Sequence, residues 1–406
     1  MANKLLNIFY FAKTKNCFIS ILIFFSFLGD IFGQINIKIT ARVDTTNVEI
    51  KSVYNLWVNY LNSRPDSVYV NPFWLPSEVE YYFNAGMPSF DMAAMFMFRG
   101  YDSSNQFLEI YKPTVLSIEK HVIKSEEAFV IKTLFYSNKY AEHPTYSKFN
   151  PPYITKYYCT KKNGAFYLCN AIDYETAYWN RYEVGFITYI CHPSITFDAD
   201  EANAALTFCN DIVKQYNLQD PSRISFFIAP DESVMGNLYN FEYWLSYSTG
   251  MAHTPINRIV LTYPIFCHKH ELAHLLFVSE EWNTKGRPFI VNEGLATFIG
   301  GSSKTAPFEE ELQEFSKQIQ DTVITLDDIL SQRYVYPNPY YNHPIYMVGG
   351  FIFKLVYEKH KEEGVLKLFG CGRKQEDFQT VIEALFDMPY NEFEMYIIQQ
   401  LKKITH

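Results

Sequence analysis

The spacing of apolar residues in the first part of the chain predicts one helix followed by a set of strands. Apolar side chains recur every three or four positions from Val48 to Leu61, so we expect an amphipathic helix over residues 47–62. Beyond it, β-branched and aromatic residues gather in short runs between polar turns, which is typical of strands. These runs cover residues 115–123, 129–136, 154–159, 166–172 and 182–191. This part is therefore predicted to be a helix with an antiparallel sheet.

The pattern changes near His192-Pro193, where longer segments with helical spacing replace most of the strands. Two strands are predicted in this second part, over residues 224–229 and 256–263. Helices are predicted over residues 199–216, 307–321, 346–360, 379–386 and 391–402. We expect an α+β fold with a helix-plus-antiparallel-sheet domain of unknown role over residues 34–192. A mainly α-helical domain with a small sheet follows over residues 193–406.

Residues 1–33 have the pattern of a secretory signal peptide. Three lysines precede an uncharged apolar run over residues 17–28, and Gly33 offers a cleavage site. The run is too short for a comfortable membrane span, so we expect no stable span once the leader is removed; a leader retained as an anchor is the alternative. The chain is rich in Asn, Lys, Ile, Tyr and Phe, as AT-rich bacterial coding sequences are. We expect an exported protein in the periplasm, at the cell surface or in the medium.

Charge and composition narrow the classes of partner. Without residues 1–33 the chain keeps 32 basic and 43 acidic residues, which gives a net charge of −11. This acidity argues against nucleic acid and against an anionic membrane surface as partners. Aromatic residues make up 18% of the chain, which excludes wholesale disorder and suits sheet cores or a groove that binds peptides. The oligomeric state stays open.

Cysteines are few, and no Cys-x-x-Cys pair occurs. The six that follow residue 33 are Cys159, Cys169, Cys191, Cys209, Cys267 and Cys371. Their low density favours free, buried thiols. The best candidate disulfide joins Cys159 to Cys169 across a hairpin predicted at Asn163-Gly164. A three-residue loop would place these cysteines opposite each other, whereas a two-residue loop would offset them and turn them to opposite faces.

One segment, residues 266–300, has a spacing that specifies a chemistry. His270, Glu271 and His274 form a His-Glu-x-x-His pattern, and 18 residues intervene before Glu293 in Asn-Glu-Gly. Residues four apart share one face of a helix, so His270 and His274 can bind one metal ion while neighbouring leucines face the core. Glu293 lies at the start of a second predicted helix and can supply the third ligand.

Two imidazoles and one carboxylate leave the fourth position of a zinc ion open to water, which is typical of catalytic rather than structural zinc. Bound zinc lowers the pKa of that water to about 7. Glu271 is rotated by about 100° from His270, so it lies near the metal without being a natural ligand. It can take a proton from the water as general base and deliver it to the leaving amine. The alternative is a surface helix with two ordinary histidines.

The motif resembles that of the gluzincin metallopeptidases, in particular the aminopeptidase-like group called peptidase MA-like. In that group a glutamate follows His-Glu-x-x-His at the same spacing and also in an Asn-Glu-Gly context. The resemblance covers about residues 195–402 and implies a zincin-like catalytic domain. It makes His270, His274 and Glu293 the ligands of one zinc ion, and Glu271 the general base and acid.

The family also has a tyrosine that stabilises the oxyanion, downstream of the third ligand in a Tyr-x-Lys-Gly context. Tyr346, in Tyr-Met-Val-Gly, resembles this residue, with Val348 in place of the lysine. Tyr340, Tyr341 and His343 lie close enough in sequence to be alternatives.

The chain differs from the family in the motif that binds the free amino group of the substrate. Aminopeptidases of this group anchor the amine with the glutamate of a Gly-x-Met-Glu-Asn motif, whereas residues 250–253 here are Gly-Met-Ala-His. Exopeptidase activity therefore does not follow from the resemblance. An endopeptidase, or a peptidase with another anchor, becomes the stronger expectation.

We therefore expect a secreted zinc-dependent metallopeptidase that hydrolyses a peptide or protein substrate by Glu271-assisted attack of zinc-bound water. Two alternatives come from other classes. A binding or surface-assembly protein could keep the zincin fold without turnover, although the intact Glu271 argues against it. The same machinery could also hydrolyse a non-peptide substrate such as an epoxide.

Overall fold

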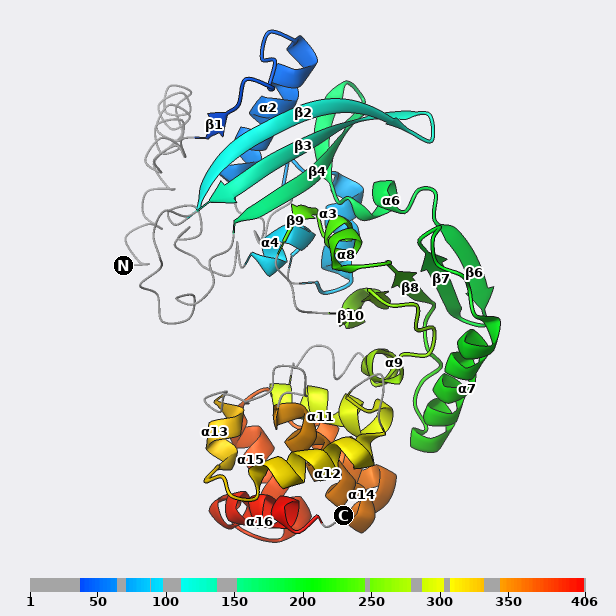
Figure 1. Ribbon diagram of the computed structural model, residues 1–406, viewed down its shortest axis with the longest axis vertical. Helices are drawn as coiled ribbons and strands as arrows, with labels where there is room; N and C mark the ends of the chain where they lie inside the picture. The colour runs from blue at the N-terminus through cyan, green and yellow to red at the C-terminus, as the bar shows by residue number, and fades with distance from the viewer. Residues whose placement is uncertain are drawn as a thin grey trace, which may run out of the picture. The chain divides into compact units, whose positions relative to one another are not determined.

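The structure is a computed structural model that describes residues 37–63, 71–87, 89–97, 111–136, 152–244, 249–278, 287–302, 307–331 and 344–404. The chain divides into two compact units. Figure 1 shows the chain coloured by residue number from blue to red. The first comprises Met1–Tyr81, Pro88–Ala171 and Asn240–Trp244, and the second comprises Tyr82–Met87, Ile172–Tyr239 and Leu245–His406. Helices and sheets occur in both, which confirms the predicted α+β fold. The predicted signal peptide lies outside the described residues, and no helix within them is long and apolar enough to cross a membrane.

The first unit contains a six-stranded sheet. Its strands are β1 (Lys38–Ile39), β2 (Lys112–Ile123), β3 (Glu126–Tyr136), β4 (Tyr153–Lys162), β5 (Ala165–Cys169) and β9 (Phe241–Tyr243). Strands β2 to β5 form an antiparallel meander, β1 runs parallel to β2, and β9 pairs with β4. The helices along this part of the chain are α2 (Val48–Leu61), α3 (Pro76–Asn84) and α4 (Met92–Phe96).

Helix α2 is the helix predicted over residues 47–62. The side chain of Asn47 caps its first turn by accepting hydrogen bonds from the backbone N–H groups of Glu49 and Ile50. Its apolar stripe is buried at Val53, Trp57, Tyr60 and Leu61. The helical period in the sequence therefore identifies the face that packs into the core.

The hairpin between β4 and β5 has a two-residue loop, Asn163-Gly164, in which both residues have positive φ. Cys159 consequently pairs with Leu168, and Cys169 pairs with Tyr158. Successive residues of a strand point to opposite faces, so the two cysteines lie on opposite sides of the sheet. Both are free and buried, and the two-residue loop excludes the candidate disulfide.

The second unit contains a five-stranded sheet in the order β10-β11-β8-β7-β6. Its strands are β6 (Asn180–Val184), β7 (Ile187–Cys191), β8 (Ile224–Ile228), β10 (Gly250–His253) and β11 (Arg258–Leu261). The three central strands are parallel, and β6 and β10 add antiparallel edges. The helices are α6 (Ile172–Glu175), α7 (Ala199–Tyr216), α8 (Glu232–Leu238), α9 (Lys269–Leu276), α11 (Phe289–Gly300), α12 (Phe308–Ile319), α13 (Leu326–Leu330), α14 (Pro344–Phe369), α15 (Gln375–Phe386) and α16 (Tyr390–Lys402).

The single strand predicted over residues 182–191 is wrong, because the chain turns back at Gly185 and forms the β6–β7 hairpin. Gly185 has a φ of 58°, which a glycine adopts without steric cost. Strand β7 then pairs with β8 in the second unit. The division between the units accordingly falls after Ala171, earlier than the predicted boundary at residue 193.

One apolar core joins the sheet and the helices of the second unit. Helix α7 contributes a stripe of mostly small buried residues: Ala202, Ala205, Cys209, Ile212 and Tyr216. The helix predicted over residues 346–360 is the first part of α14, which continues to Phe369 past a non-helical residue, Lys361. This core holds α9, α11 and α14, the three helices that carry the predicted site residues.

Candidate metal centre

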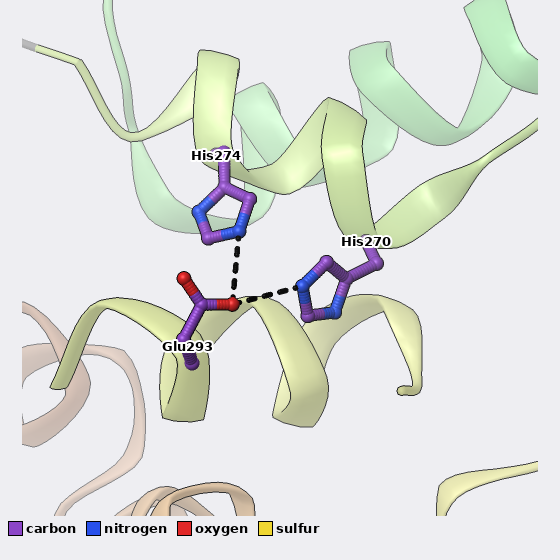
Figure 2. Close-up of side chains that lie close together, drawn as sticks. All are labelled: His270, His274 and Glu293. Carbon is purple, nitrogen blue, oxygen red and sulfur yellow. Dashed lines mark hydrogen bonds and ion pairs between the residues drawn. The ribbon is translucent and has the colours of Figure 1, made fainter. Parts of the chain in front are cut away.

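The side chains of His270, His274 and Glu293 converge (Figure 2). Both histidines lie on α9 and the glutamate lies on α11, with its carboxylate between the two imidazoles. Glu293 Oε2 is 3.3 Å from His270 Nε2 and 3.4 Å from His274 Nε2, and the three ligand atoms all lie within 4.8 Å of one another. Ligands bound tetrahedrally at about 2.1 Å are separated by about 3.4 Å. The group can therefore hold a metal ion.

Helix α9 presents the two histidines because they are four residues apart and so share one face. Its opposite side is apolar and buried at Leu272, Leu275 and Leu276. The side chain of His268 caps the helix by accepting a hydrogen bond from the Glu271 backbone N–H at 3.4 Å. The predicted division of the helix into a ligand face and a core face is what the structure contains.

A backbone carbonyl sets the orientation of the His270 ring. His270 Nδ1 lies 2.8 Å from the Gly301 carbonyl oxygen. A carbonyl only accepts, so Nδ1 carries the proton and Nε2 is directed to Glu293. The contact requires α11 to end against the start of α9, where a Cβ on Gly300 would lie 2.4 Å from the His270 backbone nitrogen. Glycine at residue 300 therefore makes this close approach possible.

The centre is buried and electrostatically coupled. His270 is 7% exposed and Glu293 is 8% exposed. Burial alone would lower the pKa of His270, but the hydrogen bond from its ring to Glu293 and the nearby carboxylate charges together outweigh burial and raise that pKa. Burial alone would raise the pKa of Glu293, yet hydrogen bonds with His270 and His274 lower it well below its usual range. The carboxylate is therefore held in its charged form, which favours a cation among these three groups.

Glu271 lies beside the three ligands and is not one of them. Its Oε1 atom is 3.2 Å from the position that a Cβ would take on Gly250 of strand β10. Its negative charge contributes to the raised pKa of both His270 and Tyr346. The Glu271 carboxylate thus lies against the sheet edge and is electrostatically coupled to the centre.

Tyr346 of α14 also reaches the centre. Its ring lies 5.8 Å from the His270 ring at an interplanar angle of 26°, and its hydroxyl hydrogen-bonds with Glu293. Burial first, and then the charges of Glu293 and Glu271, raise the pKa of Tyr346 above its usual value. The phenol therefore stays protonated and remains a hydrogen-bond donor. The alternatives Tyr340, Tyr341 and His343 lie outside the described residues.

Two glycines bring Tyr346 to Glu293. A Cβ on Gly294 would lie 2.7 Å from the Gly349 Cα atom, so α11 and α14 touch backbone to backbone. Tyr346 precedes Gly349 by about one helical turn and Glu293 precedes Gly294 directly, so the crossing places the phenol next to the carboxylate. The prediction of Tyr346 from the sequence does not include this role for the glycines, although a glycine inside each of two predicted helices signals a close helix contact.

Residues 250–253 form the edge strand β10 and supply no carboxylate. Their one titratable side chain, His253, is buried and shares a 2.8 Å hydrogen bond with the Tyr239 hydroxyl. Burial and the positive charge of Arg258 lower the pKa of His253 to about 3, so the ring is neutral. This strand therefore offers no replacement for the missing amine anchor.

Comparisons of the chain with protein-family models and with curated proteins find no match. The residues of the centre and their geometry therefore carry the assignment of a function.

Proposed function

We propose that this chain is an exported zinc metallopeptidase of the gluzincin type, in which His270, His274 and Glu293 bind one zinc ion. The observation that carries the proposal is the buried convergence of two imidazoles and one carboxylate at ligand separations of 3.3 and 3.4 Å. Two nitrogens and one oxygen suit zinc better than magnesium or calcium, which prefer oxygen ligands alone. A set of three protein ligands leaves a position for water, as in catalytic zinc sites.

When bound, zinc supplies a Lewis acid that lowers the pKa of water to about 7 and polarises the substrate carbonyl. Glu271 acts as the general base: it removes a proton from the attacking water as the new C–O bond forms. The Tyr346 hydroxyl donates a hydrogen bond to the oxyanion that develops on the carbonyl oxygen. The C–N bond then breaks, and Glu271 returns the proton to the leaving amine.

The edge strand favours cleavage inside a peptide over removal of its first residue. Strand β10 ends the five-stranded sheet, and an extended peptide can add to such an edge through main-chain hydrogen bonds. A peptide along β10 would pass Gly250, where the Glu271 carboxylate rests. Because residues 250–253 carry no carboxylate to hold a free amine, we propose an endopeptidase.

The decisive experiment compares zinc-loaded wild type with Glu271→Gln against a mixed peptide library, with and without a chelator. The amide cannot accept the proton, so cleavage should fall by about 10²–10⁴-fold while the zinc content stays the same. Glu310→Gln, an exposed change at the start of α12, serves as the matched control and should retain full activity.

Wild-type activity in Glu271→Gln would contradict the assignment of the base. A zinc-loaded wild type that cleaves no peptide in the library would favour the binding or surface-assembly alternative. Turnover of an epoxide without cleavage of peptides would instead point to a non-peptide substrate.

A further inference from the structure

Phe289 is an exposed aromatic residue at the edge of the metal centre. It is the first residue of α11 and is 46% exposed, whereas the next two residues, Ile290 and Val291, are buried. Single exposed apolar side chains are common on protein surfaces, so the place of Phe289 matters more than its exposure. Its position next to the centre makes a bound ligand the natural candidate to cover it.

The helix and the rings around Phe289 connect it to the metal ligands. Phe289 and Glu293 are four residues apart on α11 and therefore share one face of the helix. The Phe289 ring meets the Tyr346 ring edge to face, with 6.0 Å between centroids and an angle of 85°. The Tyr346 ring in turn lies over His270. Three rings thus lead outward from a metal ligand to the exposed Phe289.

The charges next to this row of rings disfavour an anionic ligand. The carboxylate of Glu293 lies one helical turn from Phe289 on α11, and Glu271 directly follows His270 on α9, so two negative charges lie at the inner end of this row. The nearest basic residue in sequence, Arg287, is committed elsewhere: its Nε donates to the Phe369 carbonyl at 2.8 Å, and its guanidinium lies 3.8 Å from the centroid of the Phe369 ring. The surroundings of Phe289 therefore suit an apolar group.

We propose that Phe289, together with the edge of Tyr346, forms a subsite that binds an aromatic side chain of the substrate next to the hydrolysed bond. An aromatic ring fits better than an aliphatic chain because it can continue the edge-to-face packing of the two rings. The identity of this ring as a peptide side chain rests on the proposed peptidase function. The subsite itself requires only a ligand that occupies the metal centre.

A binding experiment separates the subsite from catalysis. Two metal-chelating probes, acetohydroxamate and phenylacetohydroxamate, are titrated calorimetrically into the zinc-loaded full chain. The ring of the second probe should improve its affinity for wild type by about tenfold over the first. In Phe289→Ala the advantage should shrink to less than about twofold, and in Phe289→Leu it should be intermediate. Tyr178→Ala removes an aromatic residue that is 68% exposed elsewhere in the second unit, and this control should keep the wild-type preference.

Equal affinity of wild type for the two probes would overturn the subsite, as would an undiminished preference in Phe289→Ala with normal zinc content. Peptides that vary only in the residues beside the cleaved bond supply the second readout. Wild type should prefer Phe to Leu, Lys and Glu, and Phe289→Ala should lose that preference mainly through KM.

The two readouts distinguish the possible failures. A wild type that prefers the ring-bearing probe but cleaves no peptide would support the subsite and contradict the peptidase. A wild type that cleaves all peptides alike and binds both probes alike would support the peptidase and overturn the subsite. A preference for Lys beside the bond would replace apolar packing by a cation over the ring, and would also overturn the proposal.

Discussion

Within the described residues, Asp91 in the first unit and Glu293 in the second are carboxylates buried among hydrogen-bond donors, and the two sites differ in those donors. In the first unit, Asp91 is fully buried and accepts hydrogen bonds from the hydroxyls of Tyr60 and Tyr157 and from the backbone N–H of Ala94. Tyrosine hydroxyls have a pKa near 10 and donate at any ordinary pH. Because the two tyrosines belong to α2 and β4, these hydrogen bonds link helix α2 to the sheet through Asp91.

In the second unit, Glu293 is nearly as well buried, and its neighbours include two imidazoles from a single helix besides the Asn292 amide and the Tyr346 hydroxyl. An imidazole nitrogen can exchange its proton for a metal ion, which a tyrosine hydroxyl at neutral pH does not readily do. The two buried carboxylates therefore have different roles. Asp91 is satisfied by its neighbours and stabilises the fold, whereas Glu293 and the two histidines form a group that can hold a metal ion.

The largest expected effect that separates the two carboxylates is on metal affinity. Glu293→Ala removes one of three protein ligands. Changes to groups that only support a ligand typically cost 10–100-fold in metal affinity, so loss of a ligand should weaken zinc binding by more than about 100-fold. Competition with a chromophoric chelator measures this. Asp91→Ala should bind zinc like wild type, and a Glu293→Ala variant of unchanged affinity would remove Glu293 from the ligand set.

Replacing Asp91, in contrast, should lower the stability of the folded protein without affecting the metal centre. Asp91→Ala leaves the hydroxyls of Tyr60 and Tyr157 without their common acceptor, which should lower the free energy of unfolding of the first unit by about 2–3 kcal/mol. Denaturant unfolding with zinc held constant gives this value. Asp91→Asn keeps an acceptor oxygen and should lose less. If both variants unfolded like wild type, the structural role assigned to Asp91 would be wrong.

The third prediction concerns the close contact between helices α11 and α14. A Cβ on Gly294 would lie 2.7 Å from Gly349, so Gly294→Ala must push α11 and α14 apart. We expect about 2 kcal/mol of destabilisation, as for other overpacked cores, together with reduced peptide cleavage because Tyr346 moves away from Glu293. Tyr346→Phe is the matched comparison, since it removes the hydroxyl and should reduce cleavage without that loss of stability. A Gly294→Ala variant of wild-type stability would contradict the backbone contact.

The sequence predicts the local parts of this architecture because local parts depend on short-range periods. The helix over residues 47–62 and the hairpin at Asn163-Gly164 follow from spacing and turn chemistry alone. The strand predicted over residues 182–191 failed because the apolar run continues through Gly185, and the turn there depends on one backbone angle. Strand β7 belongs to the second sheet because it pairs with β8. The period of apolar residues cannot predict that contact between distant parts of the chain.

The same distinction applies to the centre. His270 and His274 are fixed by helical spacing, so their convergence is predictable, and the resemblance to a known motif adds Glu293. The crossing of α11 and α14 at Gly294 is a contact between distant parts of the chain, and it explains why Tyr346 rather than another tyrosine lies beside Glu293 within the described residues. The exposure of Phe289 likewise depends on tertiary packing, so no periodic pattern reveals it.

Two buried histidines extend the comparison of donors and acceptors. His270 and His253 are 7% and 8% exposed, so burial opposes a positive charge on both. For His270 the hydrogen bond with Glu293, the charges of Glu271 and Glu293 and the hydrogen bond with Gly301 together outweigh burial and raise the pKa. For His253 the neighbours are the Tyr239 hydroxyl and the cation of Arg258, and the pKa falls to about 3.

The smallest effect follows from this contrast and concerns acid stability. The folded state keeps His253 neutral down to about pH 3, whereas an unfolded chain protonates it near pH 6.5. Stability from this residue is therefore complete above pH 6.5 and is lost as the pH falls, because the unfolded state takes up a proton that the folded state does not. The loss should reach about 1.4 kcal/mol at pH 5.5.

His253→Gln abolishes this titration, so the difference in unfolding free energy between the variant and wild type should change by that amount between pH 7.5 and 5.5. Both proteins are measured with a chelator present, so titration of the metal ligands cancels. His121→Gln, at a half-exposed histidine on β2, is measured alongside as a second histidine substitution. An identical profile for His253→Gln and wild type would show that His253 is not held neutral.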